Sequence, residues 1–281
     1  MRRREFITLI GSTVAAWPSA ARAQQGAMPV VGVLGSGSPG GYWTGLFDAF
    51  RQGLSDTGFS EGRNVTIEAR WAEEHYDRLP ALATELIGHR PAVIAAVATP
   101  AAKAAKAAIA TIPIVFVTIA DPVQIGLVAS LNYPGGNITG VLGVEIGPKL
   151  LELLHEAIPS AAVMAFLVNP TNPNAATQSR TVQEAAQRLG VKLHVLNASN
   201  ASDFAPAFSK LRDLHVAALM VGTDVLFVAE AEQLAALSTR YRIPAIGGTR
   251  ICRRRRPDEL RRQSAQRVPR SRRLCRTYSQ G

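Results

Sequence analysis

Strands and helices alternate along most of this chain, and this alternation restricts its fold more than any other feature. Short apolar runs bounded by glycine or proline, such as Val30 to Leu34, are typical of strands buried on both faces. Stretches with apolar residues at helical spacing, such as Leu46, Phe50 and Leu54, separate these runs. The repeated order of strand and helix predicts an α/β protein with parallel sheets and crossover helices.

The alternating pattern runs from Val30 to Leu142 and starts again near Leu150, so we expect two doubly wound lobes with a hinge near Gly143 to Pro148. The predicted lobes cover residues 28–143 and 144–249. One helix is expected after Asp224, ending at Tyr241. The predicted strands are 30–34, 65–71, 93–98, 114–119, 138–142, 163–168, 192–196, 217–221 and one that begins at 244.

The first 23 residues have the character of an export signal. Basic residues at Arg2 to Arg4 precede an apolar stretch that ends near Trp17, and the small residues around Ala23 form a cleavage site. The stretch is too short and too interrupted to span a bilayer permanently. We expect cleavage after Ala23 and a periplasmic protein, exported either by the twin-arginine route or by general secretion.

The last 32 residues, 250–281, account for the whole formal net charge of the chain. They contain twelve arginines and two acids, a net charge of +10, while the remainder carries 19 basic and 19 acidic residues. Both cysteines, Cys252 and Cys275, lie in this tail. The body therefore needs no disulfide and has no thiolate metal site, and its balanced charge gives no reason to expect a nucleic-acid partner.

An arginine run of this kind is either a basic arm or the product of a shifted reading frame. Back-translation of Arg250 to Leu260 with G+C-rich codons, read from the second nucleotide, gives E-F-V-A-A-G-G-L-M-S, an ordinary strand-and-turn sequence. We interpret the tail as out of frame from a point close to Thr249, with a basic arm as the alternative. Sequencing of the locus tests this, since stop codons in the neighbouring frame would exclude it.

Small polar loops follow the expected strands, where ligands bind in open parallel sheets. Hydroxyls and amides suit a ligand carboxylate, and an aspartate suits an ammonium group. The alternative is that Ser36, Thr99 and Asp224 only cap helices. Two aromatic residues after the first strand, Tyr42 and Trp43, could stack on a ligand or pack on a helix. The candidate ligand-binding residues are Ser36, Thr99, Asp121, Asn169, Asn172 and Asp224.

The main competing hypothesis is an exported NAD(P)-dependent oxidoreductase. The glycine spacing in Gly35-x-Gly37-x-x-Gly40 is that of the dinucleotide-binding fingerprint. However, Pro39 and Gly41 delay the helix that should open inside the motif, and Glu68 lies within the second strand instead of at its end. The five histidines are dispersed and no nucleophile motif occurs. We therefore predict no catalytic residues, no metal and no cofactor.

Seven segments of the chain, taken together, carry a family resemblance. They are Pro29 to Leu34, Phe50 to Leu54, Tyr76 to Leu82, Ile112 to Phe116, Asp121 to Val123, Gly126 to Leu131 and Leu167 to Pro170. These segments resemble the ABC-transporter substrate-binding protein family that includes tryptophan- and tyrosine-binding members. The resemblance implies a type I periplasmic-binding fold without catalysis, in which two lobes close on a small solute, with an amino acid favoured, and dock on an ABC permease in the inner membrane. We also expect a monomer.

The tail departs from this family. Relatives continue with a segment like the shifted-frame string and then several dozen residues that complete the second lobe and return to the first. Without them the second lobe would be incomplete, and apolar surface and unpaired strand edges would be exposed. The chain as written is therefore expected to be less stable than a frame-restored version.

Overall fold

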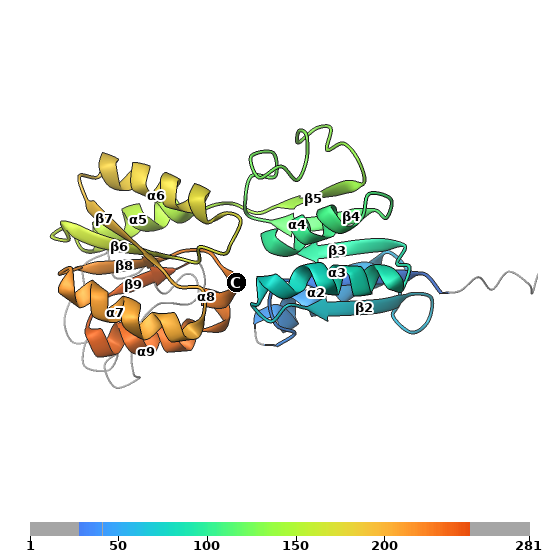
Figure 1. Ribbon diagram of the computed structural model, residues 1–281, viewed down its shortest axis with the longest axis horizontal. Coiled ribbons are helices and arrows are strands. Elements are labelled where there is room, and N and C mark those ends of the chain that lie inside the picture. The colour runs from blue at the N-terminus through green and yellow to red at the C-terminus, as the bar shows by residue number, and fades with distance from the viewer. Residues whose placement is uncertain (1–27, 41, 248–281) are drawn as a thin grey trace, which may run out of the picture.

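The computed structural model describes residues 28–40 and 42–247. They form two parallel sheets, each with its own helices, and the chain passes from the first to the second through residues 143–146 (Figure 1). Every strand pair named in either sheet is parallel, which confirms the predicted α/β class. The predicted leader and the arginine-rich tail, with Cys252 and Cys275, lie outside the described residues.

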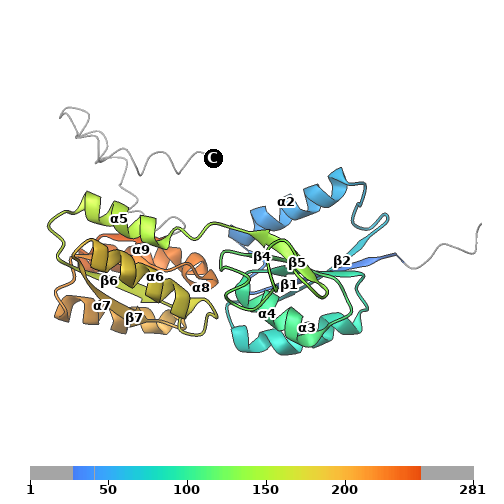
Figure 2. The same cartoon turned by 90° about the horizontal axis from the view of Figure 1, so that it is seen from above.

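The first sheet has the strand order β2-β1-β3-β4-β5. Helix α2 lies on one side of this sheet and α3 and α4 lie on the other, as Figure 2 shows. The elements of this lobe are β1 (Val30–Gly35), α2 (Tyr42–Asp56), β2 (Thr66–Trp71), the short 3-10 helix η1 (Tyr76–Arg78), α3 (Leu79–Gly88), β3 (Val93–Val97), α4 (Thr99–Ala108), β4 (Ile114–Thr118) and β5 (Ile138–Leu142).

The second sheet has the order β7-β6-β8-β9. Helices α5 and α6 pack together on one side, and α7 and α9 pack together on the other (Figure 1). The elements are α5 (Gly147–Ala157), β6 (Val163–Val168), α6 (Ala175–Arg188), β7 (Lys192–Asn197), η2 (Ala201–Asp203), α7 (Phe204–Asp213), β8 (Ala218–Val221), α8 (Val225–Ala229), α9 (Ala231–Tyr241) and β9 (Ala245–Gly247).

The helix predicted between Asp224 and Tyr241 is wrong in one respect, because the structure divides it into α8 and α9. Glu230 between them has a non-helical backbone, with φ −96° and ψ 20°. The turn lets α8 bury Phe227, whose ring lies 6.0 Å from that of Phe204, while α9 buries Leu234 in the same core. No glycine or proline marks this turn, so helical periodicity alone could not reveal it.

Among the described residues, the buried apolar side chains form one cluster in the first lobe and two in the second. The first-lobe cluster lies between the sheet and α3 and α4. In the second lobe, one cluster joins the sheet to α5 and α6, and another joins it to α7 and α9. The α2 side of the first sheet has no comparable cluster, and Val115, Val117 and Val141 on β4 and β5 are 40%, 49% and 61% exposed.

No helix in the described part of the chain is both long enough and apolar enough to cross a membrane.

Candidate functional site

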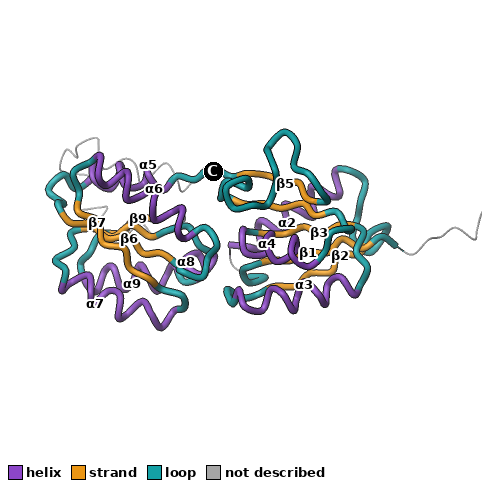
Figure 3. The backbone as a smooth tube through the Cα atoms, turned by 45° about the horizontal axis from the view of Figure 1, so that its top comes forward, coloured by secondary structure: helices purple, strands orange, loops and turns teal. Residues whose placement is uncertain are grey.

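The strand order reverses once in each sheet, between β1 and β3 in the first and between β6 and β8 in the second. In open parallel sheets, ligands bind beyond the carboxyl ends of the strands at this point. Ser36 and Thr99 follow β1 and β3, while Asn169 and Asp224 follow β6 and β8. Loops at these ends of the two sheets lie between the lobes (Figure 3).

Ser36 joins three segments of the first lobe. Its side chain is fully buried, and its hydroxyl donates to the carbonyl of Val97 at 3.2 Å while accepting the backbone N–H of Ala101 at 3.0 Å. It therefore caps α4, a helix far along the chain, instead of the helix that follows it. This hydrogen bonding fixes the elbow between β3 and α4, where Ala98 has a positive φ of 72° that is costly for a residue with a side chain.

Thr99 faces the end of the next strand. Its hydroxyl lies 2.6 Å from that of Thr118, and both side chains are buried. The Thr118 hydroxyl also accepts the N–H of Ala120 at 3.0 Å. The pair therefore ties the start of α4 to the loop after β4.

Asp121 has a local role in the structure. Its side chain is exposed, and one carboxylate oxygen accepts the N–H groups of Val123 and Gln124 at 2.9 and 3.2 Å. No contact in the structure links it to the other five candidate residues, so a ligand role for Asp121 stays a prediction.

Asp224 is the centre of the polar network in the second lobe. Its Oδ1 accepts the side-chain amide N–H of Asn169 at 3.1 Å and the backbone N–H of Leu226 at 2.9 Å, while its Oδ2 accepts the side-chain amide of Asn172 at 2.7 Å. Three of the predicted residues are thus brought together. Asp224 also caps α8 through Leu226, so the capping expected of this residue is present, and its role in ligand binding stays a prediction.

A fourth donor reaches Asp224 from the first lobe. The hydroxyl of Tyr76, in η1, donates to Oδ1 at 2.9 Å. Burial, and then the Asp224 carboxylate, raises the pKa of Tyr76 well above its usual range, so the hydroxyl keeps its proton and donates. Burial also raises the pKa of Asp224, although the four donors oppose this shift.

The sequence-based prediction missed Tyr76 as a site residue. The only available signal was its place in the segment Tyr76 to Leu82, one of those that carry the family resemblance. Periodicity could not identify it, because its partner lies 148 positions along the chain.

Two further polar side chains shape the region between the lobes. Glu74 accepts hydrogen bonds from the hydroxyl of Ser38 at 3.1 and 2.9 Å, and its pKa is raised by burial and, to a smaller degree, by Glu230 of the second lobe. Gln178 is buried and exchanges two 3.0 Å hydrogen bonds with the backbone of Thr223, one in each direction. Gln178 therefore holds the loop that carries Asp224.

The loop that follows β1 contacts Trp43. A Cβ atom built on Gly37 would lie 2.5 Å from the indole nitrogen of Trp43, so the ring packs directly against the loop backbone and requires glycine there. Tyr42 is the first residue of α2, and its side chain lies outside the described set. The stacking role of both aromatics stays a prediction.

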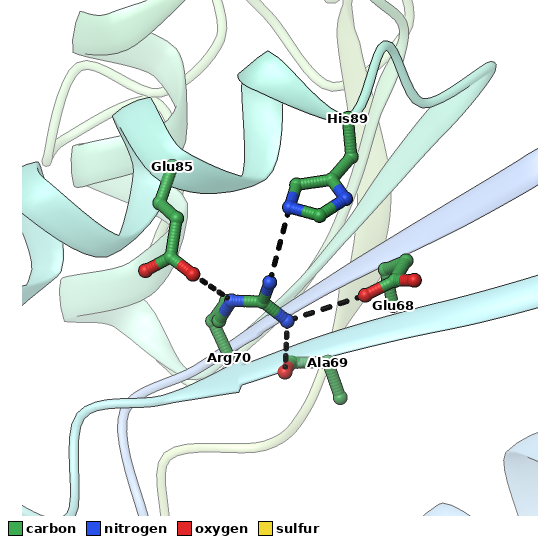
Figure 4. Close-up of polar contacts among 5 residues, drawn as sticks. All are labelled: Glu68, Ala69, Arg70, Glu85 and His89. Carbon is green, nitrogen blue, oxygen red and sulfur yellow. Dashed lines mark hydrogen bonds and ion pairs between the residues drawn. The ribbon is translucent and has the colours of Figure 1, made fainter.

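The dinucleotide alternative finds no support in the local geometry. Helix α2 begins at Tyr42, after the Gly35-x-Gly37-x-x-Gly40 motif has ended, so the motif does not open the helix. Glu68 pairs with Arg70, which also contacts Glu85 and His89 of the α3 region (Figure 4). Glu68 is therefore part of a surface network on β2. Within the described residues, no group of three or more metal-binding side chains occurs.

Comparison with known proteins gives a consistent result. The family model described as "ABC transporter substrate binding protein" matches residues 44–251. The tyrosine-binding protein of Clostridioides difficile (strain R20291) is 29% identical over 197 residues, which are 70% of this chain and 57% of that relative, so the chain matches little more than half of the relative's length.

Solved structures also resemble the chain. A conserved domain protein from Vibrio cholerae is 26% identical with a TM-score of 0.71, over 80% of this chain and 75% of its own. An ABC domain from Streptococcus pneumoniae in complex with L-Trp is 21% identical with a TM-score of 0.73, over 79% of this chain and 75% of its own. At that identity the second likeness concerns the fold alone.

Proposed function

The chain belongs to the family of ABC transporter substrate-binding proteins, and from this premise we propose that it binds a small polar solute between its two lobes and delivers it to an ABC permease in the inner membrane. The family consists of solute-binding proteins and not enzymes, in agreement with the predicted lack of catalysis. The oxidoreductase alternative is therefore set aside.

One observation carries this proposal: the loops beyond the carboxyl ends of both sheets meet in a hydrogen-bonded network at Asp224. The network joins Asn169 and Asn172 of the second lobe to Tyr76 of the first. A solute held here would contact both lobes, and lobe closure would bury it and create the surface that a permease recognises.

An amino acid is the favoured solute. Oδ2 of Asp224 receives one described donor, Asn172, so it keeps acceptor capacity for an ammonium group. Ser36 and Thr99 would act by holding the α4 elbow in place, with the helix N-terminus near a solute carboxylate. The tyrosine-binding relative and the structure in complex with L-Trp support an aromatic amino acid, and Trp43 and Tyr42 would supply stacking.

The working place and state of the protein follow from the same proposal. Family membership supports an extracytoplasmic, here periplasmic, location after cleavage behind Ala23. We propose a monomer with no cofactor, metal or nucleic-acid partner, for which the small solute and the permease are the partners.

A thermal-shift screen tests the proposal. The chain from residue 24 to 281 and a frame-restored version are each melted with L-tryptophan, L-tyrosine, other amino acids, nucleosides, sugars and nicotinamide nucleotides. A solute that binds only the folded state raises the melting temperature, by an amount that grows with its concentration over Kd. A rise with one amino acid and no turnover is expected, whereas a rise with a nicotinamide nucleotide alone would contradict the proposal.

Two substitutions localise the binding. Asp224→Asn should weaken amino-acid binding by at least tenfold, because a neutral amide attracts an ammonium group far less than a carboxylate does. Asp213→Asn, at an exposed carboxylate on the end of α7, is the matched control and should bind as the unaltered protein does. Equal binding by both variants would exclude Asp224 from the site.

A further inference from the structure

We infer that the hydrogen bond from the Tyr76 hydroxyl to Asp224 is a latch between the lobes, which stabilises the closed arrangement whether or not a solute is present. Tyr76 is thus a positioning residue that acts through Asp224. This inference rests on the proposed binding of solute between the lobes. Its closing experiment is nevertheless read on the protein without solute, so the two proposals can fail separately.

The latch is held firmly on the first-lobe side. The ring of Tyr76 packs against the first-lobe core cluster. The turn before it is braced by Arg78, whose guanidinium donates to the carbonyl of Ala72 at 3.3 Å and to the carboxylate of Glu73 at 2.6 Å. The position of the hydroxyl is therefore set by the first lobe and moves with it.

The acceptor is held equally firmly on the second-lobe side. Three of the four donors to Asp224, from Asn169, Asn172 and Leu226, belong to its own lobe. Of the four hydrogen bonds to Asp224, lobe opening would break the one from Tyr76, and the Asp224 carboxylate would keep its other three donors. The Tyr76 hydroxyl would then be hydrated. The latch can thus open without leaving a buried charge unpaired, which makes it reversible.

A repulsive pair close by opposes the latch. The carboxylates of Glu74 and Glu230 come from different lobes and repel each other, as the effect of Glu230 on the pKa of Glu74 indicates. A solute that bridges the two lobes would add contacts that exist only in the closed arrangement and would shift the equilibrium toward it.

The test uses the Tyr76→Phe variant, which keeps the ring and removes the hydroxyl. Tyr241→Phe is the matched control, because the Tyr241 hydroxyl lies 3.2 Å from that of Ser209 within the second lobe. Dyes on Ala49→Cys of α2 and Glu232→Cys of α9, both exposed positions, report the distance between lobes by energy transfer once Cys252 and Cys275 are replaced by serine.

Without solute, Tyr76→Phe should lower the closed-to-open ratio by about tenfold, and Tyr241→Phe should leave it unchanged. With L-tryptophan or L-tyrosine, whichever binds, the dissociation rate should rise by a similar factor while the association rate stays within about twofold. An unchanged closed population in Tyr76→Phe would overturn the latch, and so would a loss of affinity confined to the association rate.

The Asp224→Asn variant provides a second reading of the same contact, should Tyr76→Phe fold poorly by circular dichroism. A neutral acceptor weakens the hydrogen bond without emptying the site. It should shift the unliganded closed population in the same direction as Tyr76→Phe, and a shift toward closure would overturn the inference.

Discussion

The two lobes start from the same strand order but cover their sheets differently. In the second lobe, β6 and β8 are buried almost throughout, because helices and core clusters lie on both faces. In the first lobe, β4 alternates between buried and exposed positions and β5 is exposed along four of its five residues. The same βα pattern therefore fixes how strands pair without fixing what covers their second face.

The contrast is visible in two similar apolar runs. Ile114 to Thr118 and Val163 to Val168 are both apolar almost throughout in sequence. The second run is buried after its first residue, whereas Val115 and Val117 in the first are 40% and 49% exposed. Helix α2 contacts β2, where Phe47 meets Trp71 edge to face at 5.8 Å.

The largest effect expected from this difference comes from deleting a ring in the second lobe. Phe166→Ala, at a side chain 1% exposed in β6, should lower the free energy of unfolding by about 3–5 kcal/mol. Val117→Ala on β4 should cost less than about 1 kcal/mol, because Val117 is 49% exposed. Urea unfolding measures both. A comparable loss in Val117→Ala would mean that the exposed face is covered in solution.

A smaller difference in stability is expected when a hydrogen-bonding side chain is removed from each lobe, Asp224 from the second and Ser36 from the first. Asp224→Ala leaves the buried amide of Asn169 and the partly buried amide of Asn172 without their acceptor and should cost about 3 kcal/mol. Ser36→Ala leaves one N–H at the start of α4 without its acceptor and should cost about 1 kcal/mol. Thermal unfolding of the two variants checks the order, and a larger loss in Ser36→Ala would reverse the comparison.

Glu145, on the segment between the lobes, should make stability depend on pH. Burial raises its pKa, and the backbone N–H of Gly147 and the side chain of Asn174 oppose this. Because the folded pKa exceeds the unfolded value of about 4.3, this group's stabilisation is complete below about pH 4 and is lost as the pH rises through the raised pKa.

Glu145→Gln should remove that part of the pH dependence, measured as melting temperature between pH 4 and 8. Asp203 in the second lobe is the control of opposite sign. The backbone and side chain of Ser199 lower its pKa, so its stabilisation is present above about pH 4 and is lost as the pH falls below that value. If Asp203→Asn and Glu145→Gln changed the profile in the same direction, one of these assignments would be wrong.

The smallest expected effect is on the exposed first-lobe face. Val141→Thr, at a side chain 61% exposed on β5, should change the free energy of unfolding by no more than about 0.5 kcal/mol. The exposed side chains of Val115, Val117 and Val141 together form an apolar surface, so the substitution should also reduce the binding of a dye specific for apolar surface. Unchanged dye binding would show that the dye does not bind at these three residues.

The sequence predicted most of the fold because strand burial and helix spacing are local properties. Strand bounds agree within one or two residues, and the restart near Leu150 matches the second sheet. The break at Glu230 and the cap that Ser36 places on α4 escaped prediction, since both depend on packing between distant segments. For the same reason the cluster around Asp224 could be predicted only as loops, and Tyr76 not at all.

The order of the strands along the chain has a consequence for synthesis. Within residues 28–247, all five strands of the first sheet come before any strand of the second, and residues 143–162, which include α5, separate the two groups. All strands that pair in the first sheet are therefore synthesised before the first strand of the second sheet. Each of these two groups of strands can therefore acquire its topology from its own stretch of chain, and the docking of one lobe on the other is a separate, later step.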